Sequence, residues 1–293
     1  MEVVEMTVPM TMLKFVIRGP ALLVSFVLDV VMCALLPPAL GLVLFLASIA
    51  AAGALALGKF EVVAIRMLTR SRLATAPEFQ VLAPALVELG ARGVDVGPVF
   101  VRRVQDPQTP AVVAIGHRAL VVTLGLVEAL YCGGITGTEA EAVLAHAVGR
   151  RRALKPRLEL AVLLATAPWR VVIATFRSVG RTFAWLPLTR AAWALRGVVG
   201  VICVAQSVAE GRVWPGFLGG AVIALTYLVP AAGRAIETRA EIAADQFVVE
   251  LGLGGLLIQV LRRFGYPLTL ERLRRLESAP TPNERPRLYL VPG

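Results

Sequence analysis

One histidine and two carboxylates have the types and spacing of an incomplete zinc site. His146 begins the stretch His-Ala-Val-Gly-Arg, and Glu241 and Asp245 follow much later in the chain. A zinc-binding helix of the H-E-x-x-H type needs imidazoles at i and i+4, which share one face, and a glutamate beside the first imidazole as general base. Here the base position is Ala147 and the second ligand position is Arg150. A guanidinium cannot lose its proton to bind a metal, so one ligand and the base are missing.

The remaining groups predict an ion pair in place of a metal. A working zinc hydrolase uses about three protein ligands, a metal-bound water and a base for its proton. The fixed charge of Arg150 repels zinc and attracts Glu241, because a guanidinium and a carboxylate match as a two-pronged pair. We therefore expect an Arg150–Glu241 ion pair to join the two motifs. On this interpretation no cofactor is expected, and zinc is bound only if the site is active.

Composition assigns the chain to the membrane proteins. Of 293 residues, 57% are hydrophobic, and the mean hydropathy is +0.74. The net charge is +10, and lysine occurs only at Lys14, Lys59 and Lys155, so nearly all of the positive charge is arginine between apolar stretches. This pattern favours cytoplasmic loops and anionic lipid over nucleic acid, for which no module is recognised. The cysteines form no C-x-x-C pair, which argues against a disulfide framework or a cysteine metal site.

Two apolar runs near the N-terminus predict a membrane hairpin. Residues 21–36 and 39–57 flank Pro37-Pro38, and each run, with a few flanking residues, approaches the roughly 20 residues needed to cross a bilayer. The double proline ends the first helix. Basic residues before and after the hairpin place both of its ends in the cytoplasm by the positive-inside rule. Asp29, within the first run, is either a functional carboxylate or a protonated or partnered packing residue.

A polar block follows, and it carries His146. Apolar spacing predicts a helix in its first part, and short β-branched runs predict a small sheet or hairpin. Thr138 and Glu141 have the spacing of a capping box at the start of the helix that carries His146. His117 is expected at the surface, in a turn before a strand. The predicted elements are a helix over 75–90, strands over 99–104, 112–115 and 120–123, and a short helix over 125–131.

The two motifs can meet only if an even number of membrane spans separates them. Arg170, Arg177 and Arg181 share one helical face, so residues 158–183 are predicted to lie along the membrane surface. Residues 193–208 and 216–233 then form a second hairpin that turns at 210–215. In the alternative topology, residues 158–176 form the third span and 216–233 the fourth. Short helices are expected over 253–264 and 268–276.

The order of elements resembles the HtpX-like integral-membrane zinc metalloproteases, the metallopeptidase family 48 group that includes the CAAX prenyl-protein endopeptidase. The resemblance is carried by "VVTLGLVEAL" before "TEAEAVLAH", and by "RAEIAADQFVVELG" after a second membrane region. It implies a mainly α, zincin-like fold with a small β-sheet and about four transmembrane helices. It also makes Glu241 the third zinc ligand and Asp245 its supporting carboxylate. Ala111 stands where the family's Asn-Ala-Phe-Ala segment begins, and Ala279 stands where its Thr-His-Pro-Pro motif has histidine.

Four parts of the chain are expected. They are a transmembrane hairpin (1–68), a cytoplasmic helix and small-sheet block with the degenerate active-site helix (69–152), an interfacial helix with a second transmembrane hairpin (153–236), and a cytoplasmic helical part with the Glu241 and Asp245 motif (237–293). Both termini and the motif-bearing parts are expected on the cytoplasmic side of the plasma membrane.

The favoured function is that of an inactive, metalloprotease-like membrane protein that binds a partner or substrate. The alternative is an active HtpX-type membrane zinc endopeptidase with a non-standard ligand set, and a third interpretation is a membrane scaffold without a cleft. The expected partners are the lipid bilayer and a membrane protein or peptide, not nucleic acid. The sequence leaves the oligomeric state open.

Overall fold

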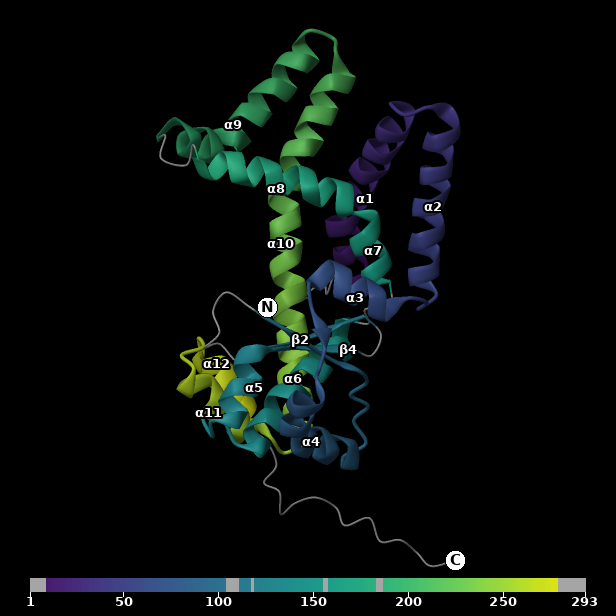
Figure 1. The fold of residues 1–293 in the computed structure, drawn as a ribbon. Helices are drawn as coiled ribbons and strands as arrows, with labels where there is room; N and C mark the ends of the chain where they lie inside the picture. Colours follow the sequence, from purple (N-terminus) through teal and green to yellow (C-terminus); the bar gives the residue numbers. More distant parts are fainter. Residues whose placement is uncertain (1–8, 104–110, 117–118, 155–157, 183–186, 279–293) are drawn as a thin grey trace, which may run out of the picture. The chain divides into compact units, whose positions relative to one another are not determined.

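A computed structural model describes residues 9–103, 111–116, 119–154, 158–182 and 187–278 (Figure 1). The fold is mainly helical with one small sheet, as predicted. The chain divides into two compact units. We call residues 1–52 with 162–237 the hairpin unit, and residues 53–161 with 238–293 the motif unit.

The hairpin unit begins with two antiparallel helices, α1 (Met10–Ala34) and α2 (Pro38–Ala56). The turn between them contains Pro37, and it is tight, because a Cβ on Gly41 would collide with the backbone oxygen of Cys33. The rings of Phe26 and Phe45 pack edge to face across the pair, with centroids 6.0 Å apart. The predicted N-terminal hairpin is therefore confirmed.

The segment after the motif helix forms two helices in place of one, α7 (Glu159–Ala165) and α8 (Ala167–Thr182). The break comes just before Pro168, which has no N–H to donate back along a helix. One uninterrupted helix over 158–176 is thus not formed, and the topology in which this segment crosses the membrane remains a prediction. The backbone N–H of Trp169 donates to Ser25 Oγ (3.3 Å), so α8 begins against α1 and extends away from it (Figure 1). The side chains of Arg177 and Arg181 lie outside the described part, and the surface location of this segment remains a prediction.

A second antiparallel pair completes the hairpin unit, α9 (Pro187–Ala209) and α10 (Val213–Glu250). The two helices are joined by a turn in which Gly211 has φ +72°. Arg196 of α9 stacks over the ring of Tyr227 of α10 (4.1 Å to the centroid) and donates from Nε to Thr226 Oγ1 (3.2 Å). These contacts confirm that the two predicted segments form a helical hairpin, whereas its crossing of a membrane remains a prediction.

Three helices of the described chain, α1, α2 and α10, are long and apolar enough to cross a membrane. The corresponding part of α9, Leu195–Ala209, is shorter, so the fourth predicted span is not shown by the same criterion. Large apolar side chains on these helices point outward, as contact with lipid requires, and examples are Leu23, Val43, Val201 and Phe217.

Helix α10 is longer than a membrane requires. Its 38 residues extend about 57 Å at 1.5 Å per residue, against a hydrocarbon core of about 30 Å. The sequence turns polar from Arg234 onward. The last turns of α10, which carry Glu241 and Asp245, therefore lie outside the membrane-spanning part and belong to the motif unit.

The motif unit contains a four-stranded sheet among its described residues, in the order β1-β2-β4-β3. Strand β4 is parallel to β2, with Val99 opposite Leu120, and antiparallel to β3, and every residue of β4 is buried. The predicted sheet is confirmed. Strand β1 was not predicted, because its two residues are too few to show an alternation of apolar and polar side chains. The strands are β1 (Arg72–Leu73), β2 (Val99–Arg102), β3 (Val112–Ile115) and β4 (Ala119–Thr123).

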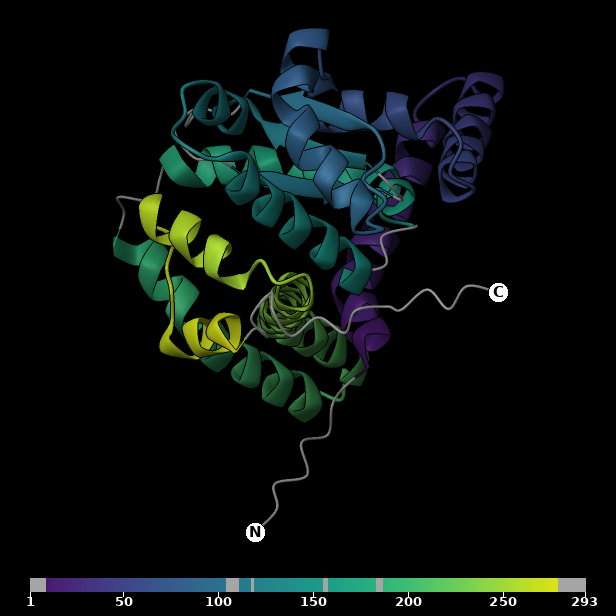
Figure 2. The ribbon, with the colours of Figure 1, turned by 90° about the horizontal axis from the view of Figure 1, so that it is seen from below.

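The core of the motif unit is built around α6, the helix that carries His146. More than half of its residues are buried, including Leu144 and Val148, and it packs on α4, α11 and β3. Figure 2 looks almost along α10 and shows α6 on one side of it and α12 on the other. The helices of this unit are α3 (Glu61–Thr69), α4 (Ala76–Ala91), α5 (Leu124–Tyr131), α6 (Gly137–Leu154), α11 (Gly254–Arg263) and α12 (Leu270–Glu277).

Candidate functional site

The N-terminus of α6 is fixed by a reciprocal capping pair. The backbone N–H of Thr136 donates to Glu139 Oε2 (2.8 Å), and the backbone N–H of Glu139 donates to Thr136 Oγ1 (3.2 Å). The predicted Thr138–Glu141 capping box is therefore wrong by two residues. The physical reason is that Glu141 faces inward and is buried, so its carboxylate cannot turn back to the helix start.

Two arginines from other elements bind the acidic residues of α6. Arg92, at the end of α4, approaches Glu141 with Nε 2.5 Å from Oε1 and also donates to the backbone oxygen of Leu251 (2.8 Å). Arg263 of α11 pairs with Glu139 at 2.9 Å. Burial alone raises the pKa of Glu139, but the hydrogen bonds from Thr136 and the charge of Arg263 outweigh it, so the pKa lies below its ordinary value. Both carboxylates thus hold α6 against its neighbours.

Close packing sets α6 against the last turns of α10. A Cβ on Gly149 would lie 2.8 Å from Phe247 Cβ and 3.0 Å from Ala244 Cα, closer than side chains ordinarily approach. The guanidinium of Arg152 stacks on the ring of Phe247, 4.4 Å from its centroid. This approach brings His146 beside Asp245.

The predicted site residues His146, Glu241 and Asp245 come together around Arg272 of α12. His146 Nε2 lies 3.2 Å from Asp245 Oδ1. Arg272 donates from Nε to Asp245 Oδ2 (3.1 Å) and from Nη2 to Asp245 Oδ1 (3.0 Å). Its Nη1 lies 2.5 Å from Glu241 Oε1, and its Nη2 lies 3.3 Å from His146 Nε2. We call these four residues the Arg272 cluster.

The cluster runs from the protein interior to its surface. The side chain of Asp245 is fully buried, that of Arg272 is 13% exposed, and that of Glu241 is 44% exposed. Burial by itself raises the pKa of Asp245, but hydrogen bonds from His146 and Arg272 outweigh it and hold the pKa below its ordinary value. Asp245 is therefore a carboxylate at neutral pH, paired with a cation.

Helix α12 positions Arg272 in its first turn. The Thr269 hydroxyl accepts a hydrogen bond from the backbone N–H of Arg272 (3.2 Å) and so caps the helix. Leu276 is fully buried and anchors the other end. Arg275, one turn on, places Nη1 3.4 Å from Asp245 Oδ2. The helix thus presents two arginines to one buried carboxylate.

This arrangement joins α6, α10 and α12 through one guanidinium. The two groups that would bind zinc, His146 Nε2 and the Glu241 carboxylate, both contact the guanidinium of Arg272. Ala147, at the base position, is 2% exposed and has no proton acceptor. Within the described ranges, no group of three or more His, Cys, Asp or Glu side chains is placed to hold a metal ion. These donors do not fit zinc while Arg272 is in place.

Other sequence predictions have different outcomes. The cation that contacts Glu241 is Arg272, and the Arg150–Glu241 pair remains a prediction. Ala111 pairs with Thr123, since its N–H donates to Oγ1 (2.9 Å) and its oxygen accepts the Thr123 N–H (2.9 Å), so it starts the β3 edge. His117 and Ala279 lie outside the described residues.

Sequence reasoning did not identify Arg272. The sequence contains a weak signal for it. Leu273 and Leu276 define the inward face of α12, and the arginine directly before each leucine lies at the border of that face. This spacing selects Arg272 and Arg275 over Arg274, which the structure leaves exposed. It does not indicate which carboxylates the two arginines reach.

Comparisons of the chain with protein-family models, with curated proteins and with solved structures give no match. The resemblance to HtpX-like metalloproteases therefore rests on the motifs alone.

Proposed function

We propose that this chain is a catalytically inactive, metalloprotease-like integral membrane protein that acts by binding a partner or substrate. The observation that carries the proposal is the position of Arg272, whose guanidinium lies between His146 and Glu241. In a zinc hydrolase of this kind a metal would occupy that place and lower the pKa of its bound water. A fixed guanidinium satisfies the carboxylates but holds no water for attack.

The loss of the base supports the same proposal. General base catalysis contributes a factor of roughly 100 to 10,000 in rate, and the methyl group of Ala147 supplies none of it. The side chain at this position is buried against the core, so an added water has no acceptor there. Among the described residues, Arg272 and Ala147 thus stand at the positions of the electrophile and the base.

The proposed binding role uses the partly exposed face of the Arg272 cluster on the cytoplasmic side of the membrane. The exposed part of Glu241 and the side chain of His146, which is 21% exposed, give a partner access to this face. The apolar helices keep the motif unit at the bilayer, where a membrane protein or a membrane-tethered peptide is the natural partner. The cytoplasmic orientation follows from the basic residues that flank the first hairpin.

A second candidate function is an active zinc endopeptidase with a non-standard ligand set. It is favoured by one observation, the contact of His146, Glu241 and Asp245, from two separate helices, with the one guanidinium of Arg272. This function requires Arg272 to leave the cluster and a third ligand and a base to be supplied by another residue or by a partner protein.

Metal analysis combined with a cleavage assay separates the two functions. The full chain, purified in detergent, is measured for zinc and incubated with an unstructured membrane-tethered peptide, with His146→Ala as the comparison variant. We expect substoichiometric zinc and no difference in cleavage between the two proteins. Cleavage that a chelator stops and that His146→Ala abolishes would reject the inactive interpretation.

Crosslinking tests the binding role against that of a passive scaffold. A photoreactive residue at exposed Glu271, whose partner Arg275 also contacts Asp245 of the Arg272 cluster, should give the same crosslinked partner in repeated membrane preparations. Labelling that spreads evenly over abundant membrane proteins would favour the scaffold.

A further inference from the structure

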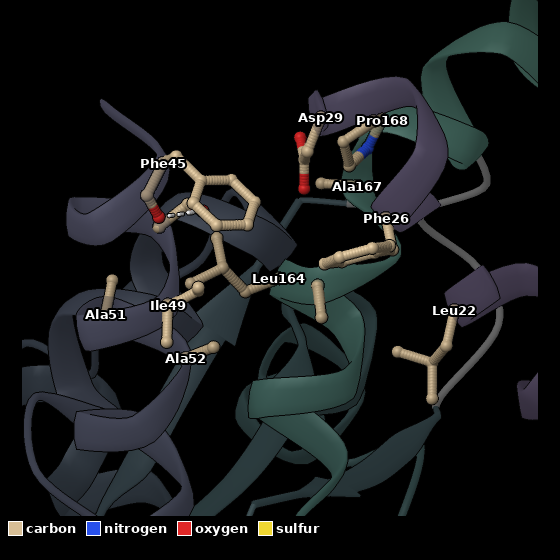
Figure 3. Close-up of a pocket in the computed structure, with 12 residues that line it drawn as sticks. Leu22, Phe26, Asp29, Phe45, Ile49, Ala51, Ala52, Leu164, Ala167 and Pro168 are labelled. Atoms are coloured by element: carbon tan, nitrogen blue, oxygen red, sulfur yellow. Dashed lines mark hydrogen bonds between the residues drawn. The ribbon is translucent and has the colours of Figure 1, made fainter. Parts of the chain in front are cut away.

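A cavity of about 490 Å³ lies inside the hairpin unit, between α1, α2 and the start of α8 (Figure 3). Its size falls in the range of about 300 to 1,000 Å³ that is typical of small-molecule sites. Its walls are mostly hydrocarbon, formed by Leu22, Phe26, Phe45, Ile49, Leu164 and Pro168. The cavity belongs to helices that are apolar enough to span a membrane, so a ligand can reach it from the lipid phase.

Asp29 is the one ionisable side chain among the described residues that line this cavity. Figure 3 shows its carboxyl group beside Ala167, at one end of the apolar walls. No hydrogen bond or ion pair joins Asp29 to any residue in the described part of the chain. The other polar lining group, the Ser48 hydroxyl, donates to the backbone oxygen of Phe45 (2.9 Å). The cavity therefore has one carboxyl group at which a ligand can supply the partner.

A cationic partner would stabilise the charged form of Asp29 at its position in α1. It lies near the middle of the apolar run over 21–36, where a charged side chain is costly unless it is paired. An ammonium group offers a compensating charge and three donors, and charge-assisted hydrogen bonds are roughly twice as strong as neutral ones. A hydrocarbon chain attached to that group would cover the apolar walls.

We propose that this cavity binds a single-chain amphiphile with a protonated primary amine as its head group. The ammonium group pairs with Asp29, and the chain lies between Phe26, Phe45 and Ile49. The positive head group distinguishes this ligand from a fatty acid, whose carboxylate would be repelled by the carboxylate of Asp29. The site shares no residue with the Arg272 cluster and does not depend on the function proposed for it.

The test uses head groups of different charge on one chain length. The full chain is reconstituted in phosphatidylcholine nanodiscs and photolabelled with a dodecylamine that carries a diazirine on its chain. Labelled peptides are mapped by mass spectrometry, and unlabelled dodecylamine, dodecanol and dodecanoate compete. We expect labels on α1 and α2 around the cavity, and competition by dodecylamine at concentrations about tenfold lower than by the other two.

Three variants assign this preference to the cavity. Asp29→Asn should remove the advantage of dodecylamine over dodecanol, whereas Glu128→Gln, an exposed carboxylate of the motif unit, should leave it unchanged. Ala52→Leu reduces the free volume of the cavity without changing Asp29, and it should weaken labelling with every head group. This variant tests the cavity even if Asp29→Asn fails to fold. The proposal is overturned if dodecanoate competes as well as dodecylamine, if Asp29→Asn keeps the amine preference, or if labels spread over the lipid-facing residues alone.

Discussion

Arg272 and Glu241 lie on different helices, and their side chains meet with Nη1 2.5 Å from Oε1. The same guanidinium makes two hydrogen bonds to Asp245 and contacts His146. A single side chain of α12 thus joins α10 and α6 at the place where the sequence predicts an ion pair instead of a metal. The cation at this joint is supplied by the chain itself.

Removal of Arg272 should destabilise the motif unit. Arg272→Ala leaves the buried Asp245 carboxylate with Arg275 as a more distant cation, and loss of one partner of a buried pair costs about 3 to 5 kcal/mol. Arg272→Lys keeps the charge but loses the planar fork, so an intermediate loss is expected. The measurement is thermal unfolding in detergent, with exposed Arg274→Ala as the control. Equal stability of the Arg272→Ala and Arg274→Ala proteins would show that the cluster does not hold the helices together.

Gly149 should tolerate no side chain. Gly149→Ala introduces a methyl group 3.0 Å from the backbone Cα of Ala244, and such overpacking costs about 1 to 3 kcal/mol. Gly90→Ala is the matched control, because Gly90 lies in α4 with open space where its methyl group would stand, and it should gain about 0.5 to 1 kcal/mol from helix propensity. Opposite shifts in the unfolding temperature are expected. A stable Gly149→Ala protein would mean that α6 and α10 can separate without loss.

The cap of α6 gives a test in which two neighbouring threonines differ. Thr136→Ala removes the acceptor for the Glu139 N–H and should cost about 1 kcal/mol. Thr138→Ala, two residues on, should cost less than about 0.5 kcal/mol. Denaturant unfolding of both variants measures the difference. A larger effect at Thr138 would restore the capping box expected from the sequence.

The same region shows why part of the fold is predictable and part is not. Thr136-x-x-Glu139 and Thr138-x-x-Glu141 match the capping pattern equally well, and the choice between them depends on Glu141 facing Arg92 across the core. That contact joins residues far apart in sequence, and no local pattern encodes it. The two hairpins are predictable because apolar run length and proline act locally.

The candidate site also has a part that the sequence predicts, the two carboxylates, and a part that it does not, the partner cation. The helical spacing of Glu241 and Asp245 places both carboxylates near His146, as the motifs predict. The partner cation is not predictable from the motifs, because several arginines are available and only the packing of α12 selects Arg272. Sequence proximity alone favours Arg150, the arginine within the motif.

Acid should weaken the start of α4. The forked hydrogen bonds from Arg72 (2.6 and 2.7 Å) outweigh the effect of burial and, with those from Thr75, lower the pKa of Glu78 from 4.5 to about 2. A lowered folded-state pKa stabilises the fold above about pH 4.5, and this contribution is lost as the pH falls toward 2. Because Arg72 is 51% exposed, solvent screening reduces the contribution to about 1 kcal/mol.

The corresponding variant is Glu78→Gln, compared with exposed Glu128→Gln. Its unfolding temperature should fall below that of the unchanged protein at pH 7, and the difference should shrink as the pH is lowered below 4.5. A difference that stays constant down to about pH 2.5 would assign the effect to the neutral cap hydrogen bonds from Thr75.

Two substitutions together should convert the Arg272 cluster into a metal site. Arg150→His places an imidazole one turn from His146 on the same helical face, which gives two nitrogen ligands with Glu241 as the third. While Arg272 is present, its guanidinium still contacts His146 and Glu241, so the single variant should retain little zinc. Arg150→His with Arg272→Ala should retain about one zinc ion per chain, measured by elemental analysis after removal of loosely bound metal. Further substitution of His146→Ala should abolish this binding. Stoichiometric zinc in the Arg150→His protein with Arg272 intact would contradict the role given to the guanidinium, because the metal would then displace it without assistance.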